Sequence, residues 1–124
     1  INLIEHQINR TDKDFIDRFV ILLNNKAIGM VGCICMDKGN YIYGLYYQIS
    51  RAYWGCGYAS EAASALMHYV FNEYPNAIFK AEVVSENPAS ASVLRRIGLK
   101  QTHIEENGFK RNNFALDLIH YSNA

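Results

Sequence analysis

The chain has 124 residues, of which 50% are hydrophobic and 13% aromatic, and its 12 basic side chains equal its 12 acidic ones in number. This length is enough for one domain with one core and too short for two. The balanced charge excludes the strong field typical of proteins that bind nucleic acids or anionic membranes. No apolar run approaches the thickness of a bilayer and no signal peptide is recognisable, so we expect a soluble, cytoplasmic protein.

The three cysteines form neither a zinc-binding pattern nor a disulfide framework. Cys33 and Cys35 are alternate residues of an apolar stretch, which favours buried, reduced thiols. We therefore expect no metal site.

Residues 1–10 carry an apolar pattern that fits one face of a short helix. That face would consist of Leu3, Ile4 and Ile8. We expect the first strand only after this stretch, beginning near Arg18.

Three strand patterns follow and are joined by two tight turns. The strands cover residues 18–23, 27–36 and 41–49, which are rich in β-branched, aromatic and other apolar side chains. The turns are predicted at residues 24–26 and 37–40, where asparagine, aspartate and glycine gather. Connections this short predict an antiparallel meander.

A glycine-bearing turn leads from the third strand directly into an amphipathic helix. Gly55 and Gly57 mark the turn, and apolar residues recur at helical spacing from Ala59 to Phe71. The first N–H groups of a helix have no partner within it and carry the positive end of its dipole, so they attract anions. Our first hypothesis is a phosphate-bearing cofactor held at residues 55–60.

This turn allows three interpretations. A phosphate loop of nucleotide hydrolases ends in Gly-Lys-Ser/Thr, but Tyr58 follows Gly57, so that interpretation fails. A dinucleotide fingerprint G-x-G-x-x-G is matched only in part, because Ser60 stands where the third glycine belongs. A plain strand-to-helix connection is the third interpretation, and it is the usual one for an isolated G-x-G.

The rest of the chain predicts a strand, a helix and a final hairpin. A mostly apolar strand covers residues 77–85, and a short helix runs from Pro88 to Ile97. Because a helix connects it to the preceding strand, we expect the strand at 77–85 to lie parallel to the one at 41–49. Two further strands, residues 100–105 and 112–121, flank an Asn-Gly pair that is typical of a hairpin turn.

Residues 53–62, Tyr-Trp-Gly-Cys-Gly-Tyr-Ala-Ser-Glu-Ala, resemble the acyl-CoA-binding motif of the GNAT superfamily of N-acyltransferases. The motif is written Q/R-x-x-G-x-G/A and falls on Trp54, Gly57 and Ala59. A tryptophan at its first position is shared by the branch that includes ribosomal-protein alanine N-acetyltransferases. A second motif of that branch, N-x-x-S-x-x-x-L-x-x-x-G-[FL], is similar to the segment from Asn87 to Leu99.

The resemblance implies an α+β fold with a mixed central β-sheet flanked by helices. We expect one acetyltransferase domain over residues 1–124. The family fold begins with a strand and one or two helices, whereas only about seventeen residues precede the first predicted strand here. We therefore expect that the family's first strand is missing or lies outside this chain.

The implied activity is transfer of an acetyl group from acetyl-CoA to a primary amine, by direct attack in a ternary complex. By position in the family, the backbone of residues 47–49 pairs with the pantetheine arm and the N–H groups of residues 55–60 hold the pyrophosphate. Asn87 and Ser90 hydrogen-bond the pantetheine or its sulfur end. The implied acetyl-CoA contacts are Tyr47, Gln48, Ile49, Trp54, Gly55, Cys56, Gly57, Tyr58, Ala59, Ser60, Asn87 and Ser90. Within this set we expect the ring of Trp54 to pack against the protein, and we interpret Cys56 as a spacing residue.

The catalytic residues are harder to assign. Glu82 is our candidate general base, and Asn87 at the sulfur end is the second candidate catalytic residue. An exposed strand residue that pairs with Lys80 or an arginine is an equally good interpretation of Glu82. Many family members place an acidic tyrosine where this chain has Leu94, so the leaving thiolate must take its proton from another group or from water.

Two other classes of function stay open beside the acetyltransferase. A reductase that binds a dinucleotide is disfavoured by the missing third glycine and by the antiparallel strands before the turn. A non-catalytic CoA-binding or protein-interaction module is the main alternative. The expected partner is an amine acceptor, either a small molecule or a protein N-terminus, with no nucleic acid and no membrane, and a homodimer is conceivable. His103 and His120 have no recognisable partner in the sequence.

Overall fold

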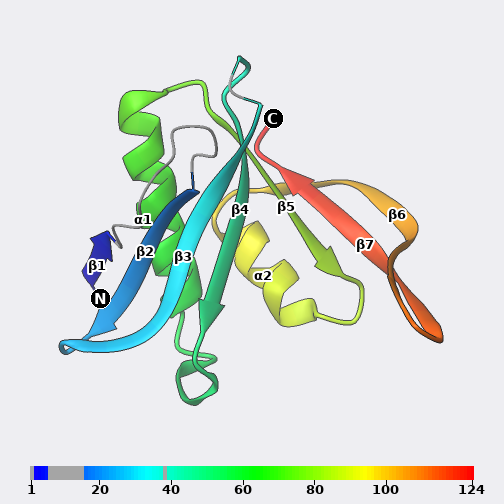
Figure 1. The fold of residues 1–124 in the computed structure, drawn as a ribbon, viewed down its shortest axis with the longest axis horizontal. Helices are drawn as coiled ribbons and strands as arrows, with labels where there is room; N and C mark the ends of the chain where they lie inside the picture. The colour runs from blue at the N-terminus through cyan, green and yellow to red at the C-terminus, as the bar shows by residue number, and fades with distance from the viewer. Residues whose placement is uncertain (1, 6–15, 38) are drawn as a thin grey trace. The chain divides into compact units, whose positions relative to one another are not determined.

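The computed structural model describes residues 2–5, 16–37 and 39–124 (Figure 1). The chain divides into two compact units, residues 1–77 and 78–124, and each unit is described by itself. The first unit contains β1 (Asn2–Glu5), β2 (Ile16–Leu23), β3 (Lys26–Asp37), β4 (Ile42–Ile49), a 3-10 turn (Arg51–Tyr53) and α1 (Tyr58–Glu73). The second unit contains β5 (Ile78–Val84), α2 (Pro88–Arg96), β6 (Lys100–Arg111) and β7 (Phe114–Ser122). The predicted α+β composition is confirmed.

In the first unit the strands follow one another in the order β1-β2-β3-β4, and every neighbouring pair is antiparallel. The turn between β2 and β3 places Asn24 and Asn25 at φ values of 51° and 66°. Two consecutive left-handed residues define the turn that matches strand twist, and asparagine tolerates this conformation. The predicted meander is therefore confirmed.

The prediction for the start of the chain is wrong for the described residues. Asn2–Glu5 form β1, which pairs with β2 from Asn2 opposite Leu22 to Glu5 opposite Phe19. The edge of β2 offers unpaired backbone groups, and pairing with them outweighs a weak helical pattern of four residues. A strand thus precedes β2, contrary to the expectation that none would, and the Ile8 part of the expected helix face lies outside the described residues.

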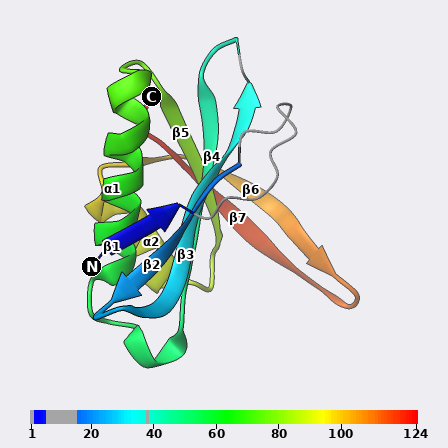
Figure 2. The same cartoon turned by 60° about the vertical axis from the view of Figure 1, so that its left-hand side comes forward.

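Helix α1 packs against β3 and β4 (Figure 2). The side chains that it buries are Ser60, Ala62, Ala63, Leu66, Met67 and Val70. Alanines in the first turns let the helix axis approach the strands closely, and Leu66 fills the space further along with no exposed surface. This packing fixes the start of α1 at the end of the turn that follows β4.

Close packing also joins β3 to the end of β4. A Cβ added to Gly29 would collide with the carbonyl oxygen of Gln48. Only glycine allows this approach, and the register between β2 and β3 shifts at the same place, between Ile21 and Leu22. The cysteine prediction is confirmed in part, because Cys33 is buried whereas Cys35 is only half-buried.

In the second unit the strand order is β5-β7-β6, again antiparallel at both pairs. Helix α2 ends in a glycine motif: Gly98 has a φ of 97°, its N–H donates to the carbonyl of Arg95, and the N–H of Leu99 donates to that of Leu94. This bonding pairs the last carbonyls of the helix. Leu94 and Leu99 are 1% and 2% exposed, so the two leucines anchor this helix end in the core.

The final hairpin differs from the prediction. The Asn-Gly pair was expected to form the turn, but β6 continues through it to Arg111 and the chain reverses at residues 112–113. Asn107, at a φ of 54°, instead belongs to a bulge between Glu105 and Phe109, and its N–H donates to Asp117 Oδ1 at 3.0 Å. A bulge needs the same left-handed residue as a turn, so the sequence signal alone could not separate them.

Neither α1 nor α2 is long and apolar enough to cross a membrane.

Candidate functional site

The turn after β4 is held by one side chain. The indole Nε1 of Trp54 donates a hydrogen bond of 2.7 Å to the carbonyl oxygen of Ile49, the last residue of β4. The Arg51 guanidinium lies 5.8 Å from the centre of the indole ring. Trp54 is 64% exposed, so the expectation that its ring packs against the protein is wrong. Trp54 instead contributes a polar contact that ties the turn to the strand.

The two glycines of the turn have the backbone conformation that glycine favours. Gly55 and Gly57 have φ values of 77° and 81°, and nothing lies within 4 Å of a Cβ placed at either residue. Gly57 is the residue that caps the N-terminus of α1, and as a glycine it has no side chain to accept a hydrogen bond from the first amides of the helix. Among the described hydrogen bonds none uses the N–H groups of Tyr58, Ala59 and Ser60, which lie at the positive end of the helix dipole. The space beside the glycines lets an anion approach these amides.

Ser60 provides a second, independent sign of a ligand at this helix end. Ser60 is 8% exposed, and its buried hydroxyl oxygen has no hydrogen-bond partner among the described residues. A buried hydroxyl without a partner costs about 1–3 kcal/mol, which a phosphate oxygen within reach would recover. Together with the uncapped amides, this hydroxyl fits a pyrophosphate group. Cys56, between the glycines, is exposed, and its thiol contacts only the Trp54 carbonyl at 3.7 Å among the described hydrogen bonds.

A shallow pocket lies at the same end of β4. It has a volume of about 120 Å³ and is lined by Gly29, Met30, Gln48, Ile49 and Ser50. Tyr47, Gln48 and Ile49 stand opposite Val31, Met30 and Gly29 of β3. In an antiparallel pair, alternate residues direct their backbone groups away from that partner. The stretch 47–49 ends β4 and lies in the same unit as the glycine turn.

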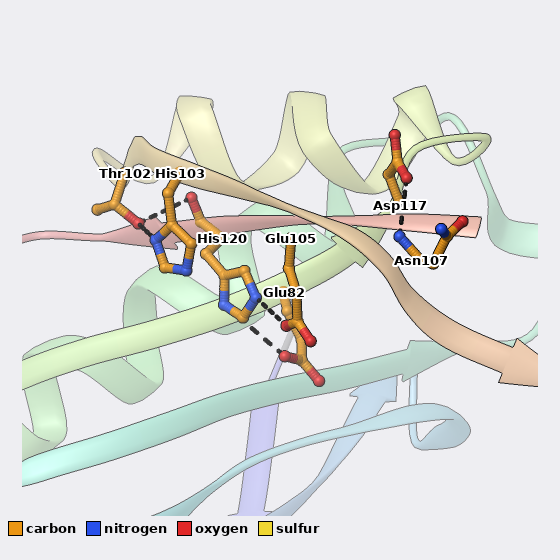
Figure 3. A network of polar contacts seen from close by, with 7 residues as sticks. All are labelled: Glu82, Thr102, His103, Glu105, Asn107, Asp117 and His120. Carbon is orange, nitrogen blue, oxygen red and sulfur yellow. Dashed lines mark hydrogen bonds and ion pairs between the residues drawn. The ribbon is translucent and has the colours of Figure 1, made fainter. Parts of the chain in front are cut away.

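The second unit holds Glu82 in a cluster of titratable side chains (Figure 3). Glu82 Oε2 lies 3.8 Å from His120 Nδ1, and His120 Nε2 lies 2.9 Å from Glu105 Oε1. The alternative that Glu82 pairs with a lysine or arginine finds no support among the described ion pairs. The expectation that His120 has no partner is wrong. Glu105 and His120 are the residues that sequence reasoning missed, because only cross-strand register brings them together.

His103 also has partners, contrary to the sequence expectation. Its ring stacks on that of His120, with ring centres 4.2 Å apart and planes inclined by 7°. Its Nδ1 lies 3.0 Å from Thr102 Oγ1, which itself donates to the His120 carbonyl at 3.2 Å. In the described residues no group of three or more histidine, cysteine or acidic side chains is suited to a metal ion.

Asn87 caps α2, as its sequence context predicts. Its Oδ1 accepts a hydrogen bond of 3.2 Å from the Ser90 N–H, and Pro88 occupies the first turn. This bond uses one oxygen and leaves the two Nδ2 hydrogens for a further partner. Residues 47–60 thus gather in the first unit, and Glu82, Asn87 and Ser90 lie in the second.

Comparison with known proteins agrees with these features. Residues 2–100 match the family model described as the acetyltransferase (GNAT) domain. The chain is 27% identical over 108 residues to the uncharacterized N-acetyltransferase p20 of Bacillus licheniformis, covering 86% of this chain and 61% of that protein. It is 26% identical over 117 residues to the uncharacterized N-acetyltransferase YnaD of Bacillus subtilis, covering 93% of this chain and 68% of that protein.

Solved structures show the same fold. A GNAT-family acetyltransferase of Bacillus anthracis aligns with a TM-score of 0.76 and 26% identity over 85% of this chain and 64% of that one. The ribosomal L7/L12 alpha-N-protein acetyltransferase RimL aligns with a TM-score of 0.78 at 19% identity, covering 87% of this chain and 68% of that one. The chain spans roughly three fifths to two thirds of the length of these four proteins. The match over residues 2–100 establishes that the chain belongs to the GNAT acetyltransferase family.

Proposed function

We propose that the chain is an acetyl-CoA-dependent N-acetyltransferase, which transfers the acetyl group to a primary amine by direct attack in a ternary complex. The observation that carries this proposal is the start of α1. Three features coincide there: a helix N-terminus without a side-chain cap, two glycines with open space beside them, and a buried Ser60 hydroxyl that has no partner among the described residues. These groups suit the pyrophosphate of acetyl-CoA. Membership in the GNAT acetyltransferase family supports acetyl-CoA as the acetyl donor.

The donor contacts are proposed residue by residue. The amides from Gly55 to Ser60 hold the pyrophosphate, with Cys56 contributing its N–H and Trp54 fixing the turn. The backbone of residues 47–49 pairs with the pantetheine arm. A related RimL structure is described as a complex with coenzyme A, at 19% identity, which supports the choice of ligand class. Bound acetyl-CoA supplies the acetyl group as a reactive thioester.

The acceptor amine must lose a proton before it can attack, because an ammonium has no free electron pair. Glu82 is our proposed general base. It is exposed enough to meet an acceptor, and its negative charge attracts an ammonium. The Nδ2 group of Asn87 is proposed to hold acetyl-CoA near the sulfur of the thioester. The Oδ1 of Asn87 is not available for this contact, because it accepts the hydrogen bond of the helix cap. Leu94 stands at the family's tyrosine position and has no proton to donate, so the thiolate takes its proton from the amine or from water.

The acceptor is proposed as a primary amine, either a small molecule or a protein N-terminus. Structural neighbours are named for both kinds, a ribosomal L7/L12 alpha-N-acetyltransferase and a spermidine N-acetyltransferase, each at 19% identity. We keep a cytoplasmic location and a homodimer as predictions. Sedimentation of the purified chain tests the dimer.

Thiol release tests the activity. Purified chain is incubated with acetyl-CoA and, in separate reactions, spermidine or a peptide with a free N-terminal alanine. Coenzyme A thiol released in proportion to acetylated amine supports the proposal. Tight acetyl-CoA binding without acetylation of any primary amine would instead favour the non-catalytic CoA-binding module.

A further inference from the structure

The cluster around His120 contains more than the proposed base. His120 of β7 stands opposite Glu82 of β5 on one side and opposite His103 of β6 on the other. Side chains of directly opposed residues project from the same face of a sheet, and Glu105 lies two residues beyond His103 on that face. The topology therefore places a histidine between two carboxylates (Figure 3).

The contacts fix which nitrogen of His120 carries the proton. Glu105 Oε1 lies 2.9 Å from His120 Nε2, and an ionised carboxylate can only accept a hydrogen bond. The proton of a neutral His120 ring must then sit on Nε2. Its Nδ1 keeps a free electron pair, and this nitrogen faces Glu82 Oε2 at 3.8 Å. Glu105 thus holds the ring in the tautomer that can receive a proton from the side of Glu82.

A second contact holds the ring plane. The Thr102 hydroxyl has one hydrogen, which it donates to the His120 carbonyl, so it accepts from His103 Nδ1. The His103 ring, fixed in this way, stacks on His120 at 4.2 Å. His120 is only 24% exposed, whereas Glu82 is 59% exposed and has room to adjust.

We propose that His120 is a proton-relay residue of the acetyl transfer, which receives through Glu82 the proton that the acceptor ammonium gives up. This inference rests on the proposed function. An imidazole is a stronger base than a carboxylate, so a proton that Glu82 takes up can pass on to the ring. Closing the 3.8 Å separation to hydrogen-bond distance needs a shift of about 1 Å.

The reaction balances without a further reactant. One ammonium proton moves to Glu82 and on to His120 Nδ1, and Glu105 faces the imidazolium that forms. The amine nitrogen bonds the acetyl carbon as the carbon–sulfur bond breaks, and the second proton of the nitrogen goes to the departing thiolate. Within the described second unit, the charged or titratable groups that face His120 are Glu82 from β5 and Glu105 and His103 from β6. Lys80 lies two residues before Glu82 on the same face of β5.

Four variants and two chemical readouts test the relay. His120→Gln and Glu105→Gln alter it, and the matched controls are His68→Gln on the exposed side of α1 and Glu106→Gln beside Glu105. Acetylation of spermidine and of the alanine peptide is followed across neutral pH, and acetyl-CoA affinity is measured calorimetrically. We expect His120→Gln to lower kcat about a hundredfold or more with unchanged acetyl-CoA affinity. Glu105→Gln should also lower kcat, because the imidazolium that forms loses a neighbouring negative charge.

Imidazole added to His120→Ala separates a relay from a structural role. Partial recovery of turnover supports the relay, whereas a loss that imidazole does not reverse overturns it. Turnover by His120→Gln at the rate of the unaltered chain also overturns the relay and leaves the acetyltransferase standing. No acetylation by the unaltered chain overturns both, so the two failures are distinguishable.

Discussion

Trp54 and Ile49 are joined by a 2.7 Å hydrogen bond from the indole Nε1 to the carbonyl oxygen. This bond connects the last residue of β4 to the turn that delivers Gly55 and Gly57 to the start of α1. Because the indole is mostly exposed, the bond and not burial gives Trp54 its role in the site. The Trp54 side chain therefore adds a polar contact to the backbone hydrogen bonds of the turn, which run from the Tyr53 and Trp54 N–H groups to the Ser50 and Arg51 carbonyls.

Trp54→Phe removes this hydrogen bond and keeps an aromatic ring. We expect acetyl-CoA to bind several-fold more weakly, because the turn amides lose their fixed position, with a stability loss of about 1 kcal/mol. Calorimetric titration measures the affinity, and denaturant unfolding measures the stability. Tyr53→Phe, next to it but outside the glycine turn, is the control and should bind normally. Equal affinities in both variants would contradict the role of the bond.

Gly57→Glu and Gly98→Glu form a matched pair. Both glycines have positive φ, 81° and 97°, and open space at Cβ, so each substitution should cost a similar roughly 1–2 kcal/mol of backbone strain. Only Gly57→Glu places a carboxylate beside the proposed pyrophosphate, and only it should lose acetyl-CoA binding. Thermal unfolding and calorimetry are run on both. Retained binding in Gly57→Glu would sink the proposed anion site.

Ser60→Ala should change stability and binding in opposite directions. The variant removes a buried hydroxyl without a partner, so the free protein should gain up to about 1 kcal/mol, while acetyl-CoA should bind more weakly. Ser64→Ala, one helical turn later and half-buried, is the control and should show neither effect. If acetyl-CoA binds Ser60→Ala with unchanged affinity, the hydroxyl is not a phosphate contact.

Asn87 combines a helix cap with a proposed donor contact, and two substitutions separate them. Asn87→Asp keeps an oxygen for the Ser90 N–H but loses the Nδ2 donor, so stability should hold while acetyl-CoA turnover falls. Asn87→Ala should in addition lose about 1 kcal/mol of stability. Thermal unfolding and thiol release measure the two effects. Full turnover by a stable Asn87→Asp would confine this residue to capping.

Asp37 gives the turn before β4 a pH dependence. The side chain and then the backbone N–H of Asn40 donate to its carboxylate and hold the pKa of Asp37 below its usual value of 3.8. A lowered folded-state pKa contributes stability above the unfolded pKa, and that contribution is lost as pH falls through the folded one. Asp37→Asn should therefore flatten the acid limb of the stability curve below about pH 4. An unchanged acid limb would refute this.

Most of the fold followed from local patterns in the sequence. Alternation, asparagine turns and the Pro88 and Gly98 signals bounded nearly every strand and both helices, because these signals act within a few residues. The errors arose where the pairing of strands, and not the local sequence, determines the structure. β1 forms because it pairs with the edge of β2. Asn107 and Gly108 lie in a bulge and not in a turn, because β6 continues beyond them.

The donor site was more predictable than the acceptor side. The glycine turn and the helix start are contiguous, so a motif reveals them, although the exposed indole was not foreseen. The His120 cluster joins residues of three strands separated by up to 38 positions, from Glu82 to His120. No spacing rule within one segment brings such residues together, and only the register of β5, β6 and β7 does so.

Calorimetric titration of the purified chain with acetyl-CoA tests the central claim most directly, with NAD and free adenosine nucleotides as controls. We expect saturable binding of acetyl-CoA, weaker binding of the nucleotides that carry phosphates without pantetheine, and no comparable binding of NAD. Equal affinity for NAD, or no binding of acetyl-CoA, would contradict the assignment of the turn from Gly55 to Ser60 as the donor site.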